Sequence, residues 1–118
     1  MLFYPVFPPP YMLRQYPPIN PTLFLQSAAT AQMLMNDASI ILKRLASSKT
    51  FATSVMSAAQ EGKKNEVQRM IESLGIKSKV ELYFNPDGIR FTLSPPPGAF
   101  LCCQLVIGLR WNIFPISP

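Results

Sequence analysis

The chain has 118 residues, which suffices for one domain around one continuous core and does not require a disulfide or a metal for folding. Hydrophobic residues make up 48% of the sequence and charged residues only 14%, well below the usual quarter, so we expect a surface that is poor in charge and prone to association. The net charge of +5 suits an anionic partner but is too diffuse to identify one.

The first residues do not read as a targeting segment. They contain no basic stretch, and prolines interrupt the apolar residues, so a secretory signal is not expected. No apolar run reaches the length of a membrane span. We therefore expect cytoplasmic synthesis, no membrane as a partner, and cysteines that are reduced by default.

Residues 1–20 are predicted to form an extended arm ahead of the folded part. Residues 1–21 hold seven of the thirteen prolines, and proline fixes φ and removes a hydrogen-bond donor, so a polyproline-II-prone segment is expected. The arm is either a disordered tail or docked on a surface, its own or a partner's, and its many aromatic side chains favour docking. The candidate contact residues are Tyr4, Tyr11 and Tyr16.

A long helix is predicted over residues 21–47, because Asn20 can cap it, Pro21 suits its first position, and neither glycine nor proline follows. At about 1.5 Å per residue it would be about 40 Å long, more than a compact domain of this size needs. Its apolar stripe therefore either meets another chain or covers only its own sheet and helices. The candidate interaction residues on this stripe are Phe24, Leu34, Met35, Ile41 and Leu42.

Two shorter helices should follow as a helical hairpin. Ser48 can cap the first, which runs through Gln60, and the EGKKN segment ends it. Gly75 stands where a cap belongs at the carboxyl end of the second. The apolar stripe of this second helix consists of Val67, Met70, Ile71 and Leu74.

From Lys77 onward the hydrophobic period changes to two, which predicts β-strands. Asn85, Pro86 and Asp87 supply a tight turn between two alternating segments, and Gly88 should take the left-handed position that follows. The SPPPGA segment at 94–99 separates this hairpin from a last strand over 101–111. We predict an α+β fold in which three helices, one of them long, pack on one face of a three-stranded antiparallel β-meander. The folded domain spans 21–112, with a tail at 113–118.

The sequence offers little catalytic chemistry. It contains no histidine, the commonest general base and metal ligand at neutral pH, and no phosphate-binding glycine loop. Its six carboxylates fall on what should be solvated helix faces, a strand's outer face or a turn. We therefore predict that the protein is not an enzyme and binds no cofactor and no metal.

Nucleic acid is a weaker candidate partner. Lys63 and Lys64 more simply solvate a turn, and Lys43 and Arg44 lie in the last turn of the long helix, where cations complement the helix dipole. Aromatic or amide side chains that could read bases are not interleaved with them. A basic nucleic-acid-binding module therefore ranks third among the functions considered.

Five segments follow one another along the chain: FYPVFPPPYMLRQYPP, NDASIILKRLASS, AAQEGKKNEVQRMIESLGI, KVELYFNPDGIRFTL and CCQLVIGLRW. With these segments in this order, nearly the whole chain resembles the small inner spore coat proteins of endospore-forming bacilli. The resemblance implies a structural, non-enzymatic protein that the mother cell deposits in the spore coat, with other coat proteins as partners. It carries over no catalytic or ligand residues.

The preferred function is therefore a structural component of a protein assembly, the spore coat, which acts through protein–protein contacts and can include a homo-oligomer. The alternative is a cytosolic adaptor or regulatory protein that binds one partner through its long helix or its Pro-rich arm.

Cys102 and Cys103 adjoin within the last predicted strand, where successive side chains point to opposite faces. Cys103 should be buried on the core face, and Cys102 should lie on the more polar face. A disulfide between the two would disrupt the geometry of the strand, and two sulfurs without histidine do not complete a zinc site. Two alternatives remain: either both thiols merely pack, or Cys102 forms an intermolecular disulfide once its surroundings become oxidising.

Overall fold

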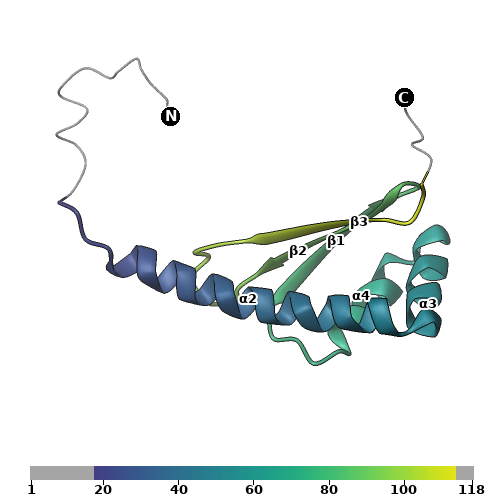
Figure 1. Cartoon of the computed structure of the whole chain (residues 1–118), viewed down its shortest axis with the longest axis horizontal. Coiled ribbons are helices and arrows are strands. Elements are labelled where there is room, and N and C mark those ends of the chain that lie inside the picture. Colours follow the sequence, from purple (N-terminus) through teal and green to yellow (C-terminus); the bar gives the residue numbers. More distant parts are fainter. Residues whose placement is uncertain (1–17, 114–118) are drawn as a thin grey trace, which may run out of the picture.

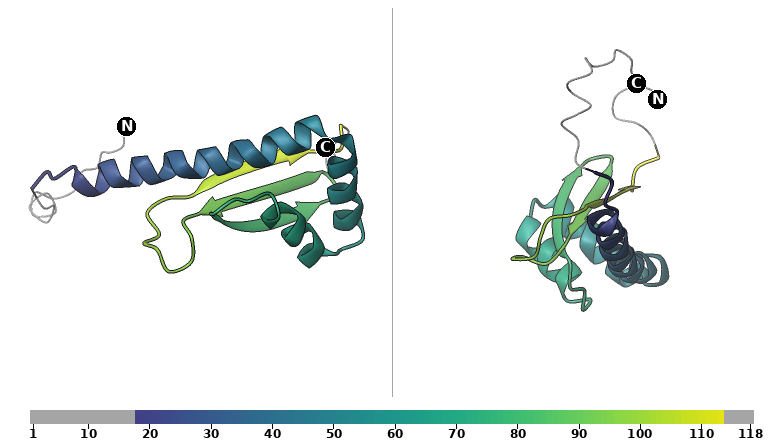
Figure 2. Two further views of the ribbon diagram at one scale, coloured as in Figure 1. Left: turned by 90° about the horizontal axis from the view of Figure 1, so that it is seen from below. Right: turned by 90° about the vertical axis from the view of Figure 1, so that its left-hand side faces the viewer.

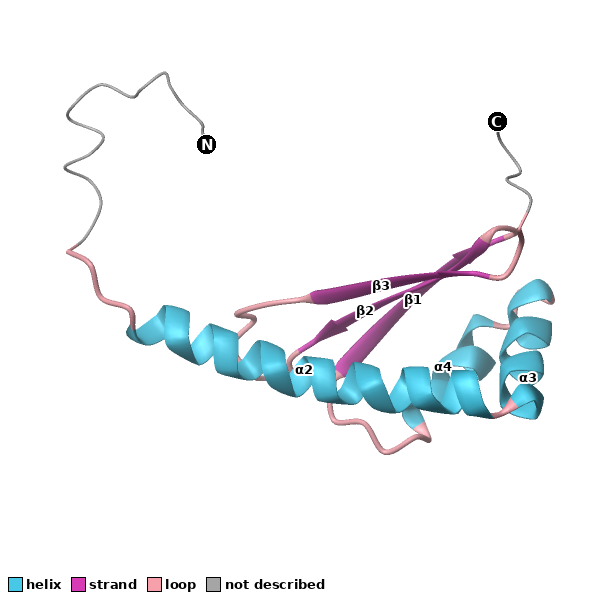
Figure 3. Ribbon diagram, viewed as in Figure 1, coloured by secondary structure: helices cyan, strands magenta, loops and turns pink. Residues whose placement is uncertain are grey.

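The computed structural model describes residues 18–113, so the tyrosines of the predicted arm, Tyr4, Tyr11 and Tyr16, lie outside the described residues. Within this range the chain forms three helices followed by three strands (Figures 1 and 3), which confirms the α+β class. The helices are α2 (Thr22–Ser47), α3 (Lys49–Gln60) and α4 (Lys64–Glu72), and the strands are β1 (Lys79–Asn85), β2 (Gly88–Ser94) and β3 (Leu105–Arg110).

The three strands form an antiparallel meander in the order β1-β2-β3. The hairpin turn between β1 and β2 is closed by Asn85, whose side-chain Oδ1 accepts hydrogen bonds from the backbone N–H groups of Asp87 at 2.8 Å and Gly88 at 3.1 Å. The prediction that Gly88 is left-handed is wrong, since the glycines with a positive φ angle are Gly62, Gly75 and Gly98. It is needed for another reason: a Cβ at this position would collide with the carbonyl oxygen of Leu109 on β3.

One face of the sheet is buried and the other is exposed. Alternate residues of β1 and β2 point to the buried face, as the period of two predicts. Phe91 stands at the middle of this face, because it lies on the central strand between Leu82 of β1 and Ile107 of β3 and is 0% exposed. The buried cluster around it consists of Ala38, Ile41, Val55, Ala58, Ala59, Val67, Ile71, Val80, Leu82, Ile89 and Leu93.

The helices cover the buried face in a definite arrangement (Figures 1 and 2). Helix α2 contacts β2 and β3, and α4 contacts β1, while α3 joins the two helices to each other. The predicted cap of α3 is present, because Ser48 Oγ accepts a hydrogen bond from the Phe51 N–H at 3.1 Å. The predicted cap of α2 is displaced: the N-cap position belongs to Pro21, which has no side-chain cap, and Asn20, one residue earlier, accepts a hydrogen bond from the Thr22 N–H at 3.0 Å.

Asp37 connects the middle of α2 to the segment that leads into β1. Its Oδ2 accepts hydrogen bonds from the backbone N–H groups of Lys77 at 3.2 Å and Ser78 at 2.9 Å, and a further one from the Ser78 hydroxyl. The sequence had suggested a solvated carboxylate at this position. Because one carboxylate oxygen accepts all of these donors, Asp37 ties α2 to the segment that leads into β1.

The last strand is shorter than predicted. The sequence indicated a strand over 101–111, but β3 begins at Leu105, and Leu101 is 62% exposed. The reason lies in β2, which ends at Ser94 and is followed by three prolines. Continued beyond the pair of Leu93 with Leu105, the register places residues 101–103 opposite these prolines. Since proline has no N–H to donate, the ladder cannot continue there.

Phe91→Ala should lower the free energy of unfolding by about 3–5 kcal/mol, because the substitution leaves a cavity at the centre of the core. Tyr83→Ala is the matched control, since Tyr83 is an aromatic residue on the exposed face of the same sheet, and it should cost less than about 1 kcal/mol. Urea unfolding followed by circular dichroism measures both. Equal losses in the two variants would contradict the assignment of the buried face.

Asp37→Ala should lower the free energy of unfolding by about 1–3 kcal/mol, because the partly buried donors of Ser78 lose an ionised acceptor. Asp37→Asn keeps one acceptor oxygen and loses only the charge, so its loss should be smaller. Chemical denaturation of the three proteins at one pH gives the comparison. An Ala variant as stable as the wild type would show that the connection between α2 and β1 does not depend on this side chain.

Candidate interaction surfaces

The N-terminal end of α2 extends past the ends of the strands, so neither the sheet nor another helix covers it (Figure 2). Its three consecutive apolar residues, Leu23, Phe24 and Leu25, are 54%, 78% and 64% exposed. Consecutive residues point to different sides of a helix, which means that this end is apolar over much of its circumference. We call these three residues the α2 tip.

The α2 tip belongs to a segment without charge. No Lys, Arg, Asp or Glu occurs between Pro21 and Asn36, and the exposed Met33 and Met35 continue the apolar surface along the helix. A solvated helix normally carries charged side chains on its exposed face. The absence of charged side chains over this length is typical of a surface that another molecule covers.

The structure divides the interaction residues predicted on α2 into two groups. Phe24 and Met35 are exposed, at 78% and 60%, and Leu42 is half-buried. Leu34 and Ile41 were also predicted to contact another chain, but they are only 2% and 0% exposed and are therefore unavailable to one. The two lie on the side of α2 that faces the interior, and Ile41 belongs to the main cluster around Phe91.

Leu23 and Leu25 were missed by the sequence reasoning, which followed a stripe at helical spacing through Phe24. A stripe is expected where one side of a helix is buried, whereas the tip has no buried side. The signal available in the sequence was the uninterrupted LFL triplet directly after the helix start.

A second apolar surface lies where α2 passes beside β3. Here the side chains line an open groove of about 530 Å³. Small residues of α2 form much of its wall, and one cation, Lys43, stands among them. We call this the α2–β3 groove, and its lining residues are Met35, Ala38, Ser39, Leu42, Lys43, Ala46, Leu105 and Ile107.

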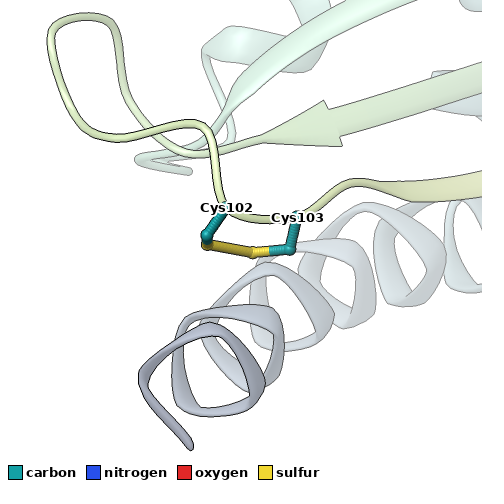
Figure 4. Close-up of a disulfide and its surroundings, with 2 residues drawn as sticks. All are labelled: Cys102 and Cys103. Atoms are coloured by element: carbon teal, nitrogen blue, oxygen red, sulfur yellow. A yellow bond between two sulfur atoms is a disulfide. The ribbon is translucent and has the colours of Figure 1, made fainter. Parts of the chain in front are cut away.

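Cys102 and Cys103 are joined to each other by a disulfide (Figure 4). The sequence indicated a strand here and therefore predicted no bond between the two, but both residues lie in the connection between β2 and β3 and are half-buried. This connection runs beside α2, since Pro96 shares a hollow with Met33 of the helix. A cross-link from Cys102 to another chain remains a prediction, and it requires the bond to Cys103 to open first.

Basic residues gather around the turn between α3 and α4, but acidic residues stand among them. Lys63 Nζ lies 3.0 Å from the carboxylate of Glu61, and this hydrogen bond, together with the negative charge, raises the pKa of Lys63 above its ordinary value. Lys64 and Arg69 share a hollow with Glu66. The mixed charges do not form the continuous basic surface that binding to phosphates requires.

Within residues 18–113 no cluster of at least three histidine, cysteine, aspartate or glutamate side chains could hold a metal ion. None of the helices in the same part of the chain combines the length and the apolar character that crossing a bilayer requires.

Comparison with known proteins identifies relatives of the chain. The family described as YuzC spore coat inner layer protein matches residues 21–104. The Bacillus subtilis (strain 168) protein YuzC is 30% identical over 105 residues, which cover 87% of this chain and 82% of that protein. No solved structure matches the chain significantly.

A thiol-alkylating reagent should leave the oxidised wild type unmodified, because its two cysteines are bonded to each other. After reduction both half-buried thiols should react, and the intact mass should first rise by two hydrogen atoms. Cys103→Ser removes the partner of Cys102, so oxidation of this variant should give covalent dimers on a non-reducing gel. Cys102→Ser is the control, and dimers of equal yield from both variants would contradict a special role for Cys102.

Proposed function

Because the chain belongs to the YuzC family of spore coat inner layer proteins, we propose that it is a structural, non-enzymatic component of the coat that binds other coat proteins through the α2 tip. The exposure of Leu23, Phe24 and Leu25 carries this proposal. Family membership favours the coat over the cytosolic adaptor that the sequence had left as an alternative.

The physical basis is the free energy of burying the tip. Fully burying one Leu or Phe side chain contributes about 1.5–3 kcal/mol, and a factor of ten in affinity corresponds to about 1.4 kcal/mol. Three such side chains on a rigid helix can therefore dominate the affinity for a partner with a matching apolar groove. Such helix-in-groove contacts are a common form of protein recognition.

The position of the tip suits an assembly protein. It projects from the folded body, so a partner can surround it without displacing the helices from the sheet (Figure 2). The core residue Leu34 lies about three turns further along α2, which separates the residues that bind from those that fold the domain.

The Pro-rich arm remains a predicted second contact. Residue 18, where the described chain begins, is four residues ahead of the first residue of α2. An arm at residues 1–20 would therefore leave the domain beside the tip, and its aromatic side chains could extend the same apolar contact.

Phe24→Glu should reduce the amount of protein retained in the detergent-resistant coat fraction of sporulating cells by roughly tenfold or more, because a charge cannot enter an apolar groove without a large desolvation cost. Thr53→Glu is the matched control, since it adds the same charge to an exposed position of α3. Quantitative immunoblots of fractionated spores provide the measurement.

Both purified variants should unfold at the wild-type temperature, since neither position is buried. If the Phe24 variant is folded and is retained in the coat as well as the Thr53 variant, binding through the α2 tip is wrong. The coat membership of the chain would stand in that case.

A further inference from the structure

The two edges of the sheet are protected to different degrees. At the β1 edge, the Gln68 side chain of α4 donates a hydrogen bond from Nε2 to the Val80 carbonyl oxygen at 2.7 Å, so it occupies a backbone acceptor that a new strand would need. Lys79 and Glu81 add charges to the same strand. Covering and charging an edge in this way are established means of preventing strand pairing.

The β3 edge has neither protection in the part of the chain that the structure describes. Its six residues are LVIGLR, in which Arg110 at the end is the only charged residue, and β2 is its only strand neighbour. Val106 is apolar and nevertheless 56% exposed. An exposed apolar edge of this kind presents free backbone groups to another chain.

The pairing with β2 determines which backbone groups are free. The Trp111 N–H donates to the Asp87 carbonyl oxygen at 3.0 Å, just beyond the pair of Arg110 with Gly88. Hydrogen-bonded and non-hydrogen-bonded pairs alternate along an antiparallel ladder. The N–H and C=O groups of Val106, Gly108 and Arg110 therefore point away from β2, toward the open edge.

We propose that this edge pairs with the β3 edge of a second copy of the chain, antiparallel and about a two-fold axis at Gly108. The two sheets then form one continuous sheet, and the outward backbone groups of each copy satisfy those of the other. An interface between identical surfaces closes on itself, as in most homodimers.

The side chains agree with this register. With Gly108 opposite its own counterpart, Ile107 lies opposite Leu109 on the helix side of the sheet. Val106 lies opposite Arg110 on the outer side, where the aliphatic part of the arginine can cover it. Gly108 itself has open space around it, so the two backbones meet at the axis without opposing side chains.

The α2–β3 groove provides the second half of the interface. It lies along the open edge, so the two α2 helices would approach each other beneath the joined strands, antiparallel because of the two-fold axis. The small residues Ser39 and Ala46 on this side of α2 allow a close approach. Burial of Met35 and Leu42 would then be completed by the second copy.

The composition of the arm favours a second copy over the arm of the same chain as the occupant. An added strand must donate backbone hydrogen bonds, and residues 1–21 contain seven prolines, which cannot donate them. The β3 segment contains no proline. Because each copy carries a net charge of +5 and Lys43 lies in the groove, moderate salt should strengthen the dimer by screening the repulsion.

Sedimentation of the purified full chain over a range of concentrations tests the proposal. The wild type should form a dimer, and Gly108→Pro should be a monomer, because it removes an outward N–H that β2 does not use. Gly108→Lys should also be a monomer, since it places two like charges at the axis. Thr92→Lys is the control for added charge, since it modifies the same face of the sheet one strand further from the edge, and it should remain dimeric.

A cross-link locates the interface independently. Gly108→Cys in a background with Cys102→Ser and Cys103→Ser should form a covalent dimer on oxidation, because directly opposed residues of this kind have Cα atoms about 5.5 Å apart, within the range of a disulfide. Thr92→Cys in the same background should not.

Circular dichroism melting of each variant shows whether it is folded. A wild type that is monomeric at all concentrations overturns the proposal. So does a dimer that persists in folded Gly108→Pro while Gly108→Cys fails to cross-link, since the copies would then meet elsewhere. Neither result affects binding through the α2 tip, which the coat-retention experiment tests separately.

Discussion

The burial of Phe91 is the constraint on which the rest of the structure depends. It lies on the central strand, so its ring can be removed from water only if β1 and β3 flank it and the helices cover it. Three short strands have little surface to bury on their own. The amphipathic helices supply the missing layer, and Asp37 ties α2 to the segment that leads into the sheet. The side of α2 that lies over the sheet takes part in covering Phe91, whereas the N-terminal end of the helix remains uncovered.

Local chemistry made most of the fold predictable. The cap at Ser48, the turn at Asn85 and the period of two in the first hairpin act within a few residues, so the sequence displays them directly. The predicted last strand was too long, because the length of β3 depends on where its neighbour β2 ends. The prolines after Ser94 end the ladder, and their effect falls on residues 101–103, which themselves look like a strand. The same error hid the bond between Cys102 and Cys103.

The burial of the apolar residues of α2 was predicted less well for a related reason. Helical spacing identifies a stripe but does not distinguish a stripe that meets its own core from one that meets a partner. Leu34 and Ile41 face the core, whereas Phe24 on the same stripe is exposed because the sheet ends before it. The difference comes from the length of the helix relative to the sheet, which is a property of the assembled fold. The unequal protection of the two sheet edges is likewise visible only once Gln68 is placed against Val80.

The overhang of α2 also has a mechanical consequence. A pull on the N-terminal end of the helix runs along its axis and reaches the body as shear between α2 and the layer beneath it, where Leu34, Ile41 and Asp37 resist together. Close-packed interiors have low compressibility and transmit strain, so these contacts carry the load together. A partner that holds the α2 tip would therefore load the domain along the helix axis, in the direction in which the helix and the sheet resist together.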